Sequence, residues 1–564
     1  MRRSTLLFAA LMASIFVFYS CRNENADGQL TLLAEGMNHG GKMLVDGYST
    51  MWASGDQVRI NDETVTVSVS DGSATVSSDS KFTAPFFGVY PAGIYGSNSG
   101  ASYTLNLPAT YSYAVADGKQ NLASPMVAYA DSGSTLMFKH LTAAIGVEVV
   151  NYYGFTIAVD SIVVESDSYK LNGAVTVTLG DDIAVVAAAG SAAADRRVKM
   201  TFGDTPLQVF AGDSTVVQVP VLPVGSGNKF TVKICVHKVD QPAVAKAIEK
   251  TQSVGGALDR SYLAYARLAT PGLFSVAANK KVIISQGNLQ YQASTGTWKF
   301  ATEQYTGIGN APGNNVFDDT RATQIAWIDL FGWGTSGYNG SAYGISNYQP
   351  YSYAGNTPSS VYGYGYGPNT RSGNNYIYEY NLTGEYANCD WGVYNAIYNG
   401  GNESNRWRTL TGGTGGEWAY LMSTRTASTV NNVSNARYLK SKVNGVNGYI
   451  VFPDEFELPE NVTVTSNHIN YNVYLGWSSV TTSLTVSDWA KMEAAGAVFL
   501  PCIGYRSYSS NNPSYNSDNG YYWSTIYRTT SDAYNIQMGG GSPNFTAYSA
   551  KRLGCSVRLV RDIN

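Results

Sequence analysis

Runs in which apolar and polar residues alternate dominate the chain between about Gly36 and Ala269. Residues 64–69 read Thr-Val-Thr-Val-Ser-Val, and Asp71-Gly72 follows as the turn signal of a β-hairpin. Further β-branched runs, separated by Gly, Asp, Asn and Pro, lie at 144–150, 161–165, 174–179, 183–188, 214–224 and 229–239. Such residues favour strands, and the strand–helix alternation of a parallel nucleotide-binding sheet is missing. The pattern predicts a β-sandwich architecture for this region.

Beyond about residue 272 the chain mixes strands, short helices and loops. Strands are predicted at 448–452, 497–501, 521–524, 533–538 and 556–560. One short helix is predicted near 417–423 and another near 487–495. In the second helix, Ser487 or Asp488 is the expected N-cap, and Trp489, Met492 and Ala495 share one face. The chain is therefore expected to be mainly β, with an α+β C-terminal part.

Long loops rich in tyrosine and glycine lie between Tyr338 and Tyr398, a stretch that holds about a third of the 42 tyrosines. Tyrosine mixed with Gly, Ser and Asn gives a broad contact area at low entropic cost. These loops are predicted to bind a protein or a glycan, although glycine-rich loops that pack on themselves are the alternative. The candidate ligand-binding residues are Tyr351, Tyr353, Tyr362, Tyr364, Tyr366, Tyr376 and Tyr378.

Composition narrows the class of protein. Only 14% of residues are charged, against about 25% in ordinary soluble domains. The difference is filled by Gly, Tyr, Ser, Thr and Asn, which suits strand-and-loop surfaces outside the cell. A net charge of −4 without any cluster of Lys and Arg argues against nucleic-acid binding.

The N-terminus has the features of an export signal. Arg2 and Arg3 precede an apolar stretch over residues 6–19, which is too short to span a bilayer. Ser20-Cys21 and the polar residues after them resemble the lipobox of bacterial lipoproteins, in which the cysteine is acylated. We therefore predict a signal peptide over 1–20, lipidation of Cys21, a polar tether over 21–35 and a place on the outer membrane. An ordinary secretory signal with an incidental cysteine is the alternative.

Catalytic and metal-binding patterns are not evident. The four histidines have no metal-ligand spacing, and no Gly-x-Ser-x-Gly elbow is present. His140 is expected to be structural. Apart from Cys21, the cysteines are Cys235, Cys389, Cys502 and Cys555. Cys502 and Cys555 could form one disulfide, or they could remain free buried thiols.

An acidic loop is the remaining place where a cation could bind. Its oxygen-bearing residues are Asp454, Glu455, Glu457, Glu460 and Asn461. Lectin-type Ca²⁺ sites use such oxygens, but the lectin motifs Glu-Pro-Asn and Trp-Asn-Asp are missing in that arrangement. A solvated loop is therefore favoured, with no metal and no cofactor. The tryptophans expected to build the core instead are Trp298, Trp327, Trp333, Trp407, Trp418 and Trp523.

A series of motifs over about 36–270 resembles the fimbrillin family, the lipoprotein subunits of type V pili. The motifs are Met51-Trp52-Ala53-Ser54-Gly55-Asp56, Val89-Tyr90-Pro91, Leu107-Pro108-Ala109-Thr110, Ser124-Pro125-Met126 and Phe138-Lys139-His140-Leu141. The resemblance implies two tandem β-sandwich subdomains, 36–150 and 151–270, divided near Val150. It also implies that pilus subunits are partners, joined by addition of a strand to an open sheet edge.

A second series, over about 273–564, looks like the FISUMP or major paralogous domain of surface lipoproteins, which is C-type-lectin-like in fold. Its motifs are 282–291, Asp329-Leu330-Phe331-Gly332-Trp333, Trp407-Arg408, Glu417-Trp418, 496–501, 520–524 and 556–561. The Trp-Arg and Glu-Trp pieces are also similar to formylglycine-generating enzymes. The catalytic cysteines of that family cannot be matched to Cys502 or Cys555, so enzymatic activity is the least favoured interpretation.

The positions of the arginines indicate whether the chain could be cleaved in the way that stalk subunits are. Stalk fimbrillins are freed by cleavage after an arginine, yet after Arg22 the next arginines are Arg59, inside an expected strand, and Arg196. A large domain also follows the fimbrillin-like part. The sequence therefore predicts a non-enzymatic fimbrial tip or accessory adhesin, with pilus subunits, other surface proteins or glycans as partners. A stand-alone glycan-binding surface lipoprotein is the alternative.

Overall fold

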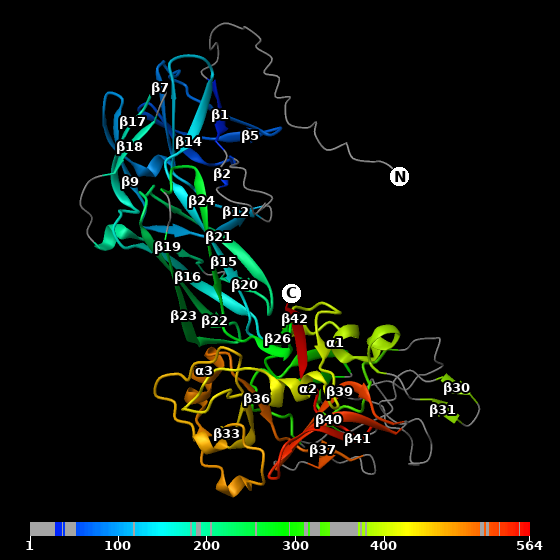
Figure 1. Cartoon of the computed structure of the whole chain (residues 1–564). Coiled ribbons are helices and arrows are strands. Elements are labelled where there is room, and N and C mark those ends of the chain that lie inside the picture. Colours follow the sequence, from blue (N-terminus) through cyan, green and yellow to red (C-terminus); the bar gives the residue numbers. More distant parts are fainter. Residues whose placement is uncertain are drawn as a thin grey trace, which may run out of the picture.

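The computed structural model describes residues 29–35, 38–39, 52–116, 119–180, 183–187, 193–203, 206–253, 257–292, 294–309, 314–315, 327–338, 370–372, 375–377, 381–507, 513–514, 518–529, 531–551 and 553–563. Within them the chain is mainly β, as predicted, with two β-sandwiches followed by an α+β domain. The first sandwich and the C-terminal domain lie at opposite ends, and the second sandwich lies between them (Figure 1). Among the described residues, no helix is long and apolar enough to cross a membrane.

The first sandwich is built on an eight-stranded sheet. Its order is β4 (Glu63–Thr66), β3 (Gln57–Ile60), β7 (Phe86–Tyr90), β13 (Met126–Ala130), β14 (Thr135–His140), β1 (Gln29–Ala34), β6 (Ser73–Ser77) and β5 (Ser68–Ser70). A smaller sheet has the order β18 (Ala184–Ala187), β17 (Gly173–Thr178), β9 (Ser102–Leu107) and β8 (Tyr95–Ser99). Along β7 the side chains alternate: Phe86 and Tyr90 enter one core, whereas Val89 packs with Leu105 and Val177 in another.

The predicted hairpin is confirmed, with a turn that its residues favour. Asp71 and Gly72 join β5 to β6, and their φ angles are +48° and +74°. Positive φ at both central residues is the geometry of a type I′ turn, which matches the twist of the flanking strands.

The expected tether over 21–35 is wrong for its last part, because residues 29–34 form β1. This strand pairs in parallel with β14 and antiparallel with β6, in the interior of the eight-stranded sheet. Leu30 and Leu32 are 1% and 2% exposed in the core. Glu35 then accepts hydrogen bonds from the His140 backbone amide at 3.2 Å and from the Ser261 hydroxyl at 2.9 Å. Only Leu30 and Leu32 follow the alternating pattern, and Leu33 interrupts it, so the strand is too short and irregular to be predicted from the sequence.

The second sandwich packs two further sheets around one core. One sheet has the order β10 (Thr110–Ser112), β19 (Arg197–Thr201), β16 (Ile157–Ser166), β22 (Lys229–Lys238) and β23 (Gln241–Ser253), with β20 (Leu207–Val209) also on β16. The other has the order β2 (Asn38–His39), β24 (Tyr262–Ala269), β15 (Ala143–Val150) and β21 (Ser214–Val221). A separate hairpin joins β11 (Ala114–Ala116) to β12 (Lys119–Asn121).

The two sandwiches exchange strands, so the expected division near Val150 does not separate them. β17 and β18 follow Val150 in sequence but pair with β9 of the first sandwich. In the opposite direction, β2 and β10 precede Val150 but belong to the second sandwich. The chain therefore crosses between the two bodies several times, which ties them together.

The C-terminal domain contains four main sheets and short helices. One sheet has the order β25 (Phe274–Ala277), β26 (Lys280–Ile284), β42 (Leu559–Ile563) and β32 (Arg408–Thr409). A second has the order β28 (Thr297–Phe300), β27 (Leu289–Gln292) and β29 (Trp327–Ile328). The third sheet has the order β35 (Ser483–Leu484), β33 (Tyr438–Val443), β34 (Val446–Val451) and β36 (Val498–Pro501). The fourth has the order β39 (Asn519–Tyr527), β40 (Asp532–Gly539) and β41 (Asn544–Ala550). Two small pairs are β30 (Thr370–Ser372) with β31 (Asn375–Ile377), and β37 (Tyr505–Arg506) with β38 (Pro513–Ser514).

Both predicted helices are present. α2 (Glu417–Ala419) continues into a π-helical turn over Tyr420–Thr424. α3 spans Val486–Ala494, and its buried face includes Trp489 and Met492. The N-cap is Thr485, not Ser487 or Asp488 as predicted: its hydroxyl accepts from the Asp488 amide, while the Asp488 carboxylate accepts from the Thr485 amide. This reciprocal capping box satisfies two amides and starts the helix earlier.

The second sandwich and the C-terminal domain meet in a close-packed junction. The Gln286 amide donates to the Gly154 carbonyl at 2.9 Å, and the Tyr153 hydroxyl donates to the Ala494 carbonyl at 2.6 Å. A Cβ added at Gly154 would lie 1.8 Å from the Ile284 carbonyl oxygen, so glycine is required for this approach. Lys238 and Glu493 form a buried ion pair at 3.4 Å across the same junction. These contacts hold the C-terminal domain in a fixed position on the second sandwich.

Candidate functional site

Most of the residues predicted to bind a ligand lie outside the described residues. This holds for Cys21 and for Tyr351, Tyr353, Tyr362, Tyr364, Tyr366 and Tyr378. The backbone of Tyr376 lies in β31, paired with Arg371 of β30. The lipidation and the tyrosine-loop surface therefore stay predictions.

A polar groove lies on the described surface of the C-terminal domain. It runs between the α1 (Trp391–Tyr394) region and the C-terminal strand β42, and it consists of two adjoining hollows of about 360 and 540 Å³. Both hollows are lined by Val393, Ser404 and Asn405. The other lining residues include Glu403, Arg406, Arg408, Arg561 and Asp562 in the first hollow, and Ala387, Asn388 and Tyr394 in the second.

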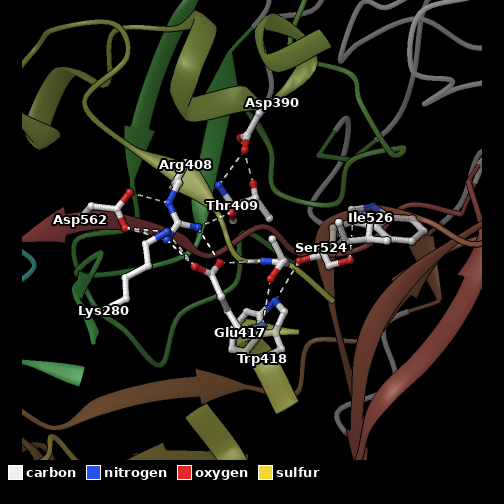
Figure 2. Close-up of polar contacts among 11 residues, drawn as sticks. Lys280, Asp390, Arg408, Thr409, Glu417, Trp418, Ser524, Ile526 and Asp562 are labelled. Carbon is white, nitrogen blue, oxygen red and sulfur yellow. Dashed lines mark hydrogen bonds and ion pairs between the residues drawn. The ribbon is translucent and has the colours of Figure 1, made fainter. Parts of the chain in front are cut away.

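Arg408 and Asp562, which line the first hollow, belong to a balanced ion-pair cluster with Glu417 and Lys280 (Figure 2). Arg408 forms two hydrogen bonds with Glu417, at 2.6 and 2.8 Å, and two with Asp562, at 2.8 and 2.6 Å. Lys280 lies 3.0 Å from Glu417 and 3.4 Å from Asp562. Burial opposes the charge on Arg408, but the two carboxylates outweigh this and raise its pKa. Two cations and two anions thus neutralise one another.

One wall of the groove comes from the domain junction. Arg406 and Arg561 both bind Asp213, which precedes β21 in the second sandwich, at 2.7 and 2.9 Å. Both arginines also donate to the Ala211 carbonyl. Arg406 makes a further ion pair with Glu403 at 3.2 Å. The junction therefore fixes one side of the groove, and its charges are paired as well.

The α1 side of the groove is held by the buried carboxylate of Asp390. It accepts hydrogen bonds from the Thr409 amide at 2.7 Å, the Thr409 hydroxyl at 2.9 Å and the Gly392 amide at 3.3 Å. Burial, partly offset by these hydrogen bonds, raises the pKa of Asp390 to about 6. The carboxylate caps α1 and fastens it to β32.

Beside these ion pairs, the groove offers uncharged polar groups. Asn388, Ser404 and Asn405 are exposed, and within the described part of the chain their side chains form no hydrogen bond. The ring of Tyr394 is 41% exposed and rests against Tyr338, with the ring centroids 5.2 Å apart. The arrangement offers amide and hydroxyl hydrogen-bonding groups beside an aromatic ring.

The disulfide considered between Cys502 and Cys555 is not formed. Both thiols are free and at most 1% exposed. Cys502 packs with residues such as Leu500 and Met538, whereas Cys555 lies in a different core cluster with Phe331. Burial raises the pKa of both thiols, which keeps them protonated. Neither is suited to nucleophilic or redox chemistry.

Three further expectations are tested by the structure. His140 is structural, as predicted: it is 1% exposed, and its ring lies 3.2 Å from the Ser124 hydroxyl and 3.1 Å from the Glu35 carbonyl. The expectation of a solvated acidic loop is wrong for Asp454, whose side chain is only 10% exposed and is paired with Arg425 at 2.8 Å. The tryptophans expected in the core are buried except for Trp327, which is partly exposed with the Lys299 ammonium 4.1 Å from its ring centroid.

The groove itself was not predicted from the sequence. Its exposed aromatic residue, Tyr394, lies near the end of the tyrosine-rich stretch but is not among the tyrosines predicted to bind a ligand. The run Asn402-Glu403-Ser404-Asn405 is a cluster of turn-forming residues, which indicates the turn that carries part of the groove. Asn402 and Asn405 indeed have positive φ angles of 56° and 57°. The pairing of the groove arginines with Asp213 had no such signal.

Comparison with known proteins gives no family assignment. No protein-family model matches the chain, and no curated protein matches it significantly. Among solved structures, a candidate cell adhesion protein from Bacteroides ovatus is 12% identical, with a TM-score of 0.27, covering 43% of this chain and 93% of its own. One from Bacteroides uniformis is 14% identical, with a TM-score of 0.21, covering 41% and 99%. A fimbrial protein from Bacteroides ovatus is 9% identical, with a TM-score of 0.22, covering 95% and 99%. These TM-scores are too low to assign a fold or a function.

Proposed function

We propose that this chain is a non-enzymatic surface lipoprotein that acts in adhesion, as a fimbrial tip or accessory subunit anchored through Cys21. The observation that carries the proposal is the position of β1. This strand is an integral part of the first sandwich, at the end of the molecule opposite the C-terminal domain (Figure 1). An anchor at the N-terminus would therefore hold the groove-bearing domain away from the membrane.

The distance between the anchor and the first sandwich is short. Cys21 precedes Gln29, the first residue of β1, by eight positions. Eight residues span at most roughly 28 Å when fully extended. The first sandwich would thus remain close to the membrane, and the fixed junction between the second sandwich and the C-terminal domain supports presentation of the latter at a distance.

Retention of β1 favours a terminal position over a repeating stalk position. Arg59, the first arginine after β1, lies in β3, where its backbone pairs with Thr64 on one side and Val89 on the other. Its guanidinium lies 4.0 Å from the centroid of the Tyr95 ring. A protease would have to unfold β3 before cutting there, so β1 is expected to keep its place in the sheet. A strand from another subunit could not then replace it.

The proposal is tested by producing the full chain in a bacterium with an outer membrane and a lipoprotein export pathway. The expected product has an acylated N-terminal cysteine by mass spectrometry, and its C-terminal domain is digested by protease added to intact cells. Cys21→Ser should abolish acylation and release the protein, whereas Cys235→Ser, at a cysteine far from the signal, should change neither. An unacylated wild-type chain, or a C-terminal domain protected from protease, would contradict the proposal.

Adhesion and assembly are measured on the same cells. Cells that display the chain should adhere to glycan- or protein-coated surfaces better than cells carrying Cys21→Ser. A heat-resistant ladder made of repeating copies of this chain would contradict the terminal position. Adhesion that needs no other pilus subunit would favour the alternative of a stand-alone glycan-binding lipoprotein.

A further inference from the structure

We propose that the polar groove binds an uncharged saccharide through Asn388, Ser404 and Asn405, with Tyr394 as the aromatic contact. The inference rests on the proposed adhesive function, and it names the ligand class and the site. It differs from the prediction of tyrosine-loop binding, because its residues lie on the α1 side of the groove.

The charge distribution selects an uncharged ligand. Arg408 is neutralised by Glu417 and Asp562, and Lys280 contacts the same two carboxylates. Arg406 and Arg561 share Asp213. A phosphate, sulfate or carboxylate entering the groove would have to displace an existing partner of an arginine. Among the described residues that line the groove, each arginine already has a carboxylate partner, so a free bidentate contact to an anion is not on offer.

The chemistry of the available groups matches sugar hydroxyls. Each asparagine amide provides two N–H donors and a carbonyl acceptor, and the serine hydroxyl both donates and accepts. A sugar hydroxyl likewise donates and accepts, so neighbouring hydroxyls can bond to both ends of one amide. The half-exposed ring of Tyr394 offers an apolar face for the C–H side of a sugar ring, next to these polar groups.

The groove is held in shape before any ligand binds. The backbone amide of Asn405 donates to the Val393 backbone carbonyl at 2.8 Å, which joins the two sides of the second hollow. The Ser336 hydroxyl donates to the backbone carbonyl of Asn388 at 2.6 Å, and Asp390 caps the helix that carries Tyr394. Preorganised groups lose less conformational entropy on binding. The backbone that carries these donors and acceptors is therefore fixed before a ligand binds.

The size of the groove suits a ligand with more than one ring. The two hollows, of about 360 and 540 Å³, each fall within the range of about 300–1,000 Å³ that is typical of small-molecule sites. They are continuous through Val393, Ser404 and Asn405. An oligosaccharide can thus extend from Tyr394 toward Asp562, whereas a single monosaccharide would fill one hollow.

The test uses the full chain in detergent on an array of neutral, sialylated and sulfated glycans, followed by titration of the glycans that bind. Neutral glycans should bind, with an affinity that changes little between 50 and about 500 mM salt, because no ion pair is formed. The double variant Asn388→Ala/Asn405→Ala, and separately Tyr394→Ala, should weaken binding at least tenfold. The matched control Asn472→Ala/Tyr474→Ala changes the same residue types in another exposed loop of this domain and should leave affinity unchanged.

Three results would overturn the inference: no binding of neutral glycans, preferential binding of acidic glycans that is lost with salt, or equal affinity of the groove variants and the wild type. Circular dichroism and thermal melting of each variant exclude misfolding as the cause of a loss. If the chain is acylated and adhesive but binds no neutral glycan, the ligand assignment fails while the proposed function stands. If it binds neutral glycans through the groove but is not acylated or exposed on cells, the proposed function fails and the site remains.

Discussion

Replacing Leu32 by alanine is expected to destabilise the first sandwich by about 3 kcal/mol. Leu32 lies in β1, is 2% exposed and packs in the core inside the eight-stranded sheet. The substitution removes roughly three carbons at about 0.8 kcal/mol each, and the cavity left behind adds a further cost. Since about 1.4 kcal/mol corresponds to a factor of ten, amide hydrogens in β1, β6 and β14 should exchange about a hundredfold faster. Hydrogen exchange followed by mass spectrometry measures this locally, without requiring the whole chain to unfold in one step.

The matched control is Leu33→Ala in the same strand. Leu33 is 45% exposed on the opposite face of the sheet, so its replacement should change stability by no more than about 0.5 kcal/mol. A polar tether over 21–35 would make both substitutions neutral. Equal and small effects at the two positions would therefore refute the assignment of β1 to the sheet.

Three other predictions concern the junction, the groove and the thiols. Asp213→Ala should loosen the junction, because two arginines of the C-terminal domain lose their shared carboxylate; small-angle scattering and faster proteolysis between the domains measure this. Burial raises the pKa of Asp390 from 3.8 to about 6, so the folded state binds this proton more tightly than the unfolded state does. The free energy of unfolding should therefore fall by about 3 kcal/mol as pH rises from about 4 to 6 and then stay constant. Urea unfolding across pH 4–7 measures that slope, which Asp390→Asn should remove. Cys502 and Cys555 should resist a thiol reagent in the native protein and react after unfolding, because both are buried; rapid native labelling of either would contradict the assignment.

Most of the predicted strands and both predicted helices are present because their signals are local, although the strand predicted at 556–560 begins only at Leu559. The Asp71-Gly72 hairpin depends on two residues that accept positive φ. Helix α3 depends on apolar residues spaced along one face, although its N-cap was misplaced by two or three residues. Signals of this kind extend over a few positions of the chain, so they can be read without knowing the fold.

The candidate site was harder to predict because its parts come from distant positions. Arg408 and Asp562 are 154 residues apart in sequence, and Arg561 contacts Ala211 across 350 residues. Sequence motifs singled out Arg408 and Glu417 but gave no reason to join them to Asp562 or Lys280. The groove asparagines have no distinguishing pattern in the sequence until α1 and β42 are brought together.

The sequence by itself determined that the chain is mainly β, because β-branched alternation and turn residues act over short distances. It also supplied the prediction of an exported, lipid-anchored protein through Cys21. Only the tertiary structure decided that β1 lies inside the first sheet, that the two sandwiches exchange strands, and that the groove's charges are paired. Each of these depends on which partner a strand or side chain meets after folding. A strand such as β1 becomes recognisable only when it pairs with β6 and β14 and its Leu30 and Leu32 enter the core.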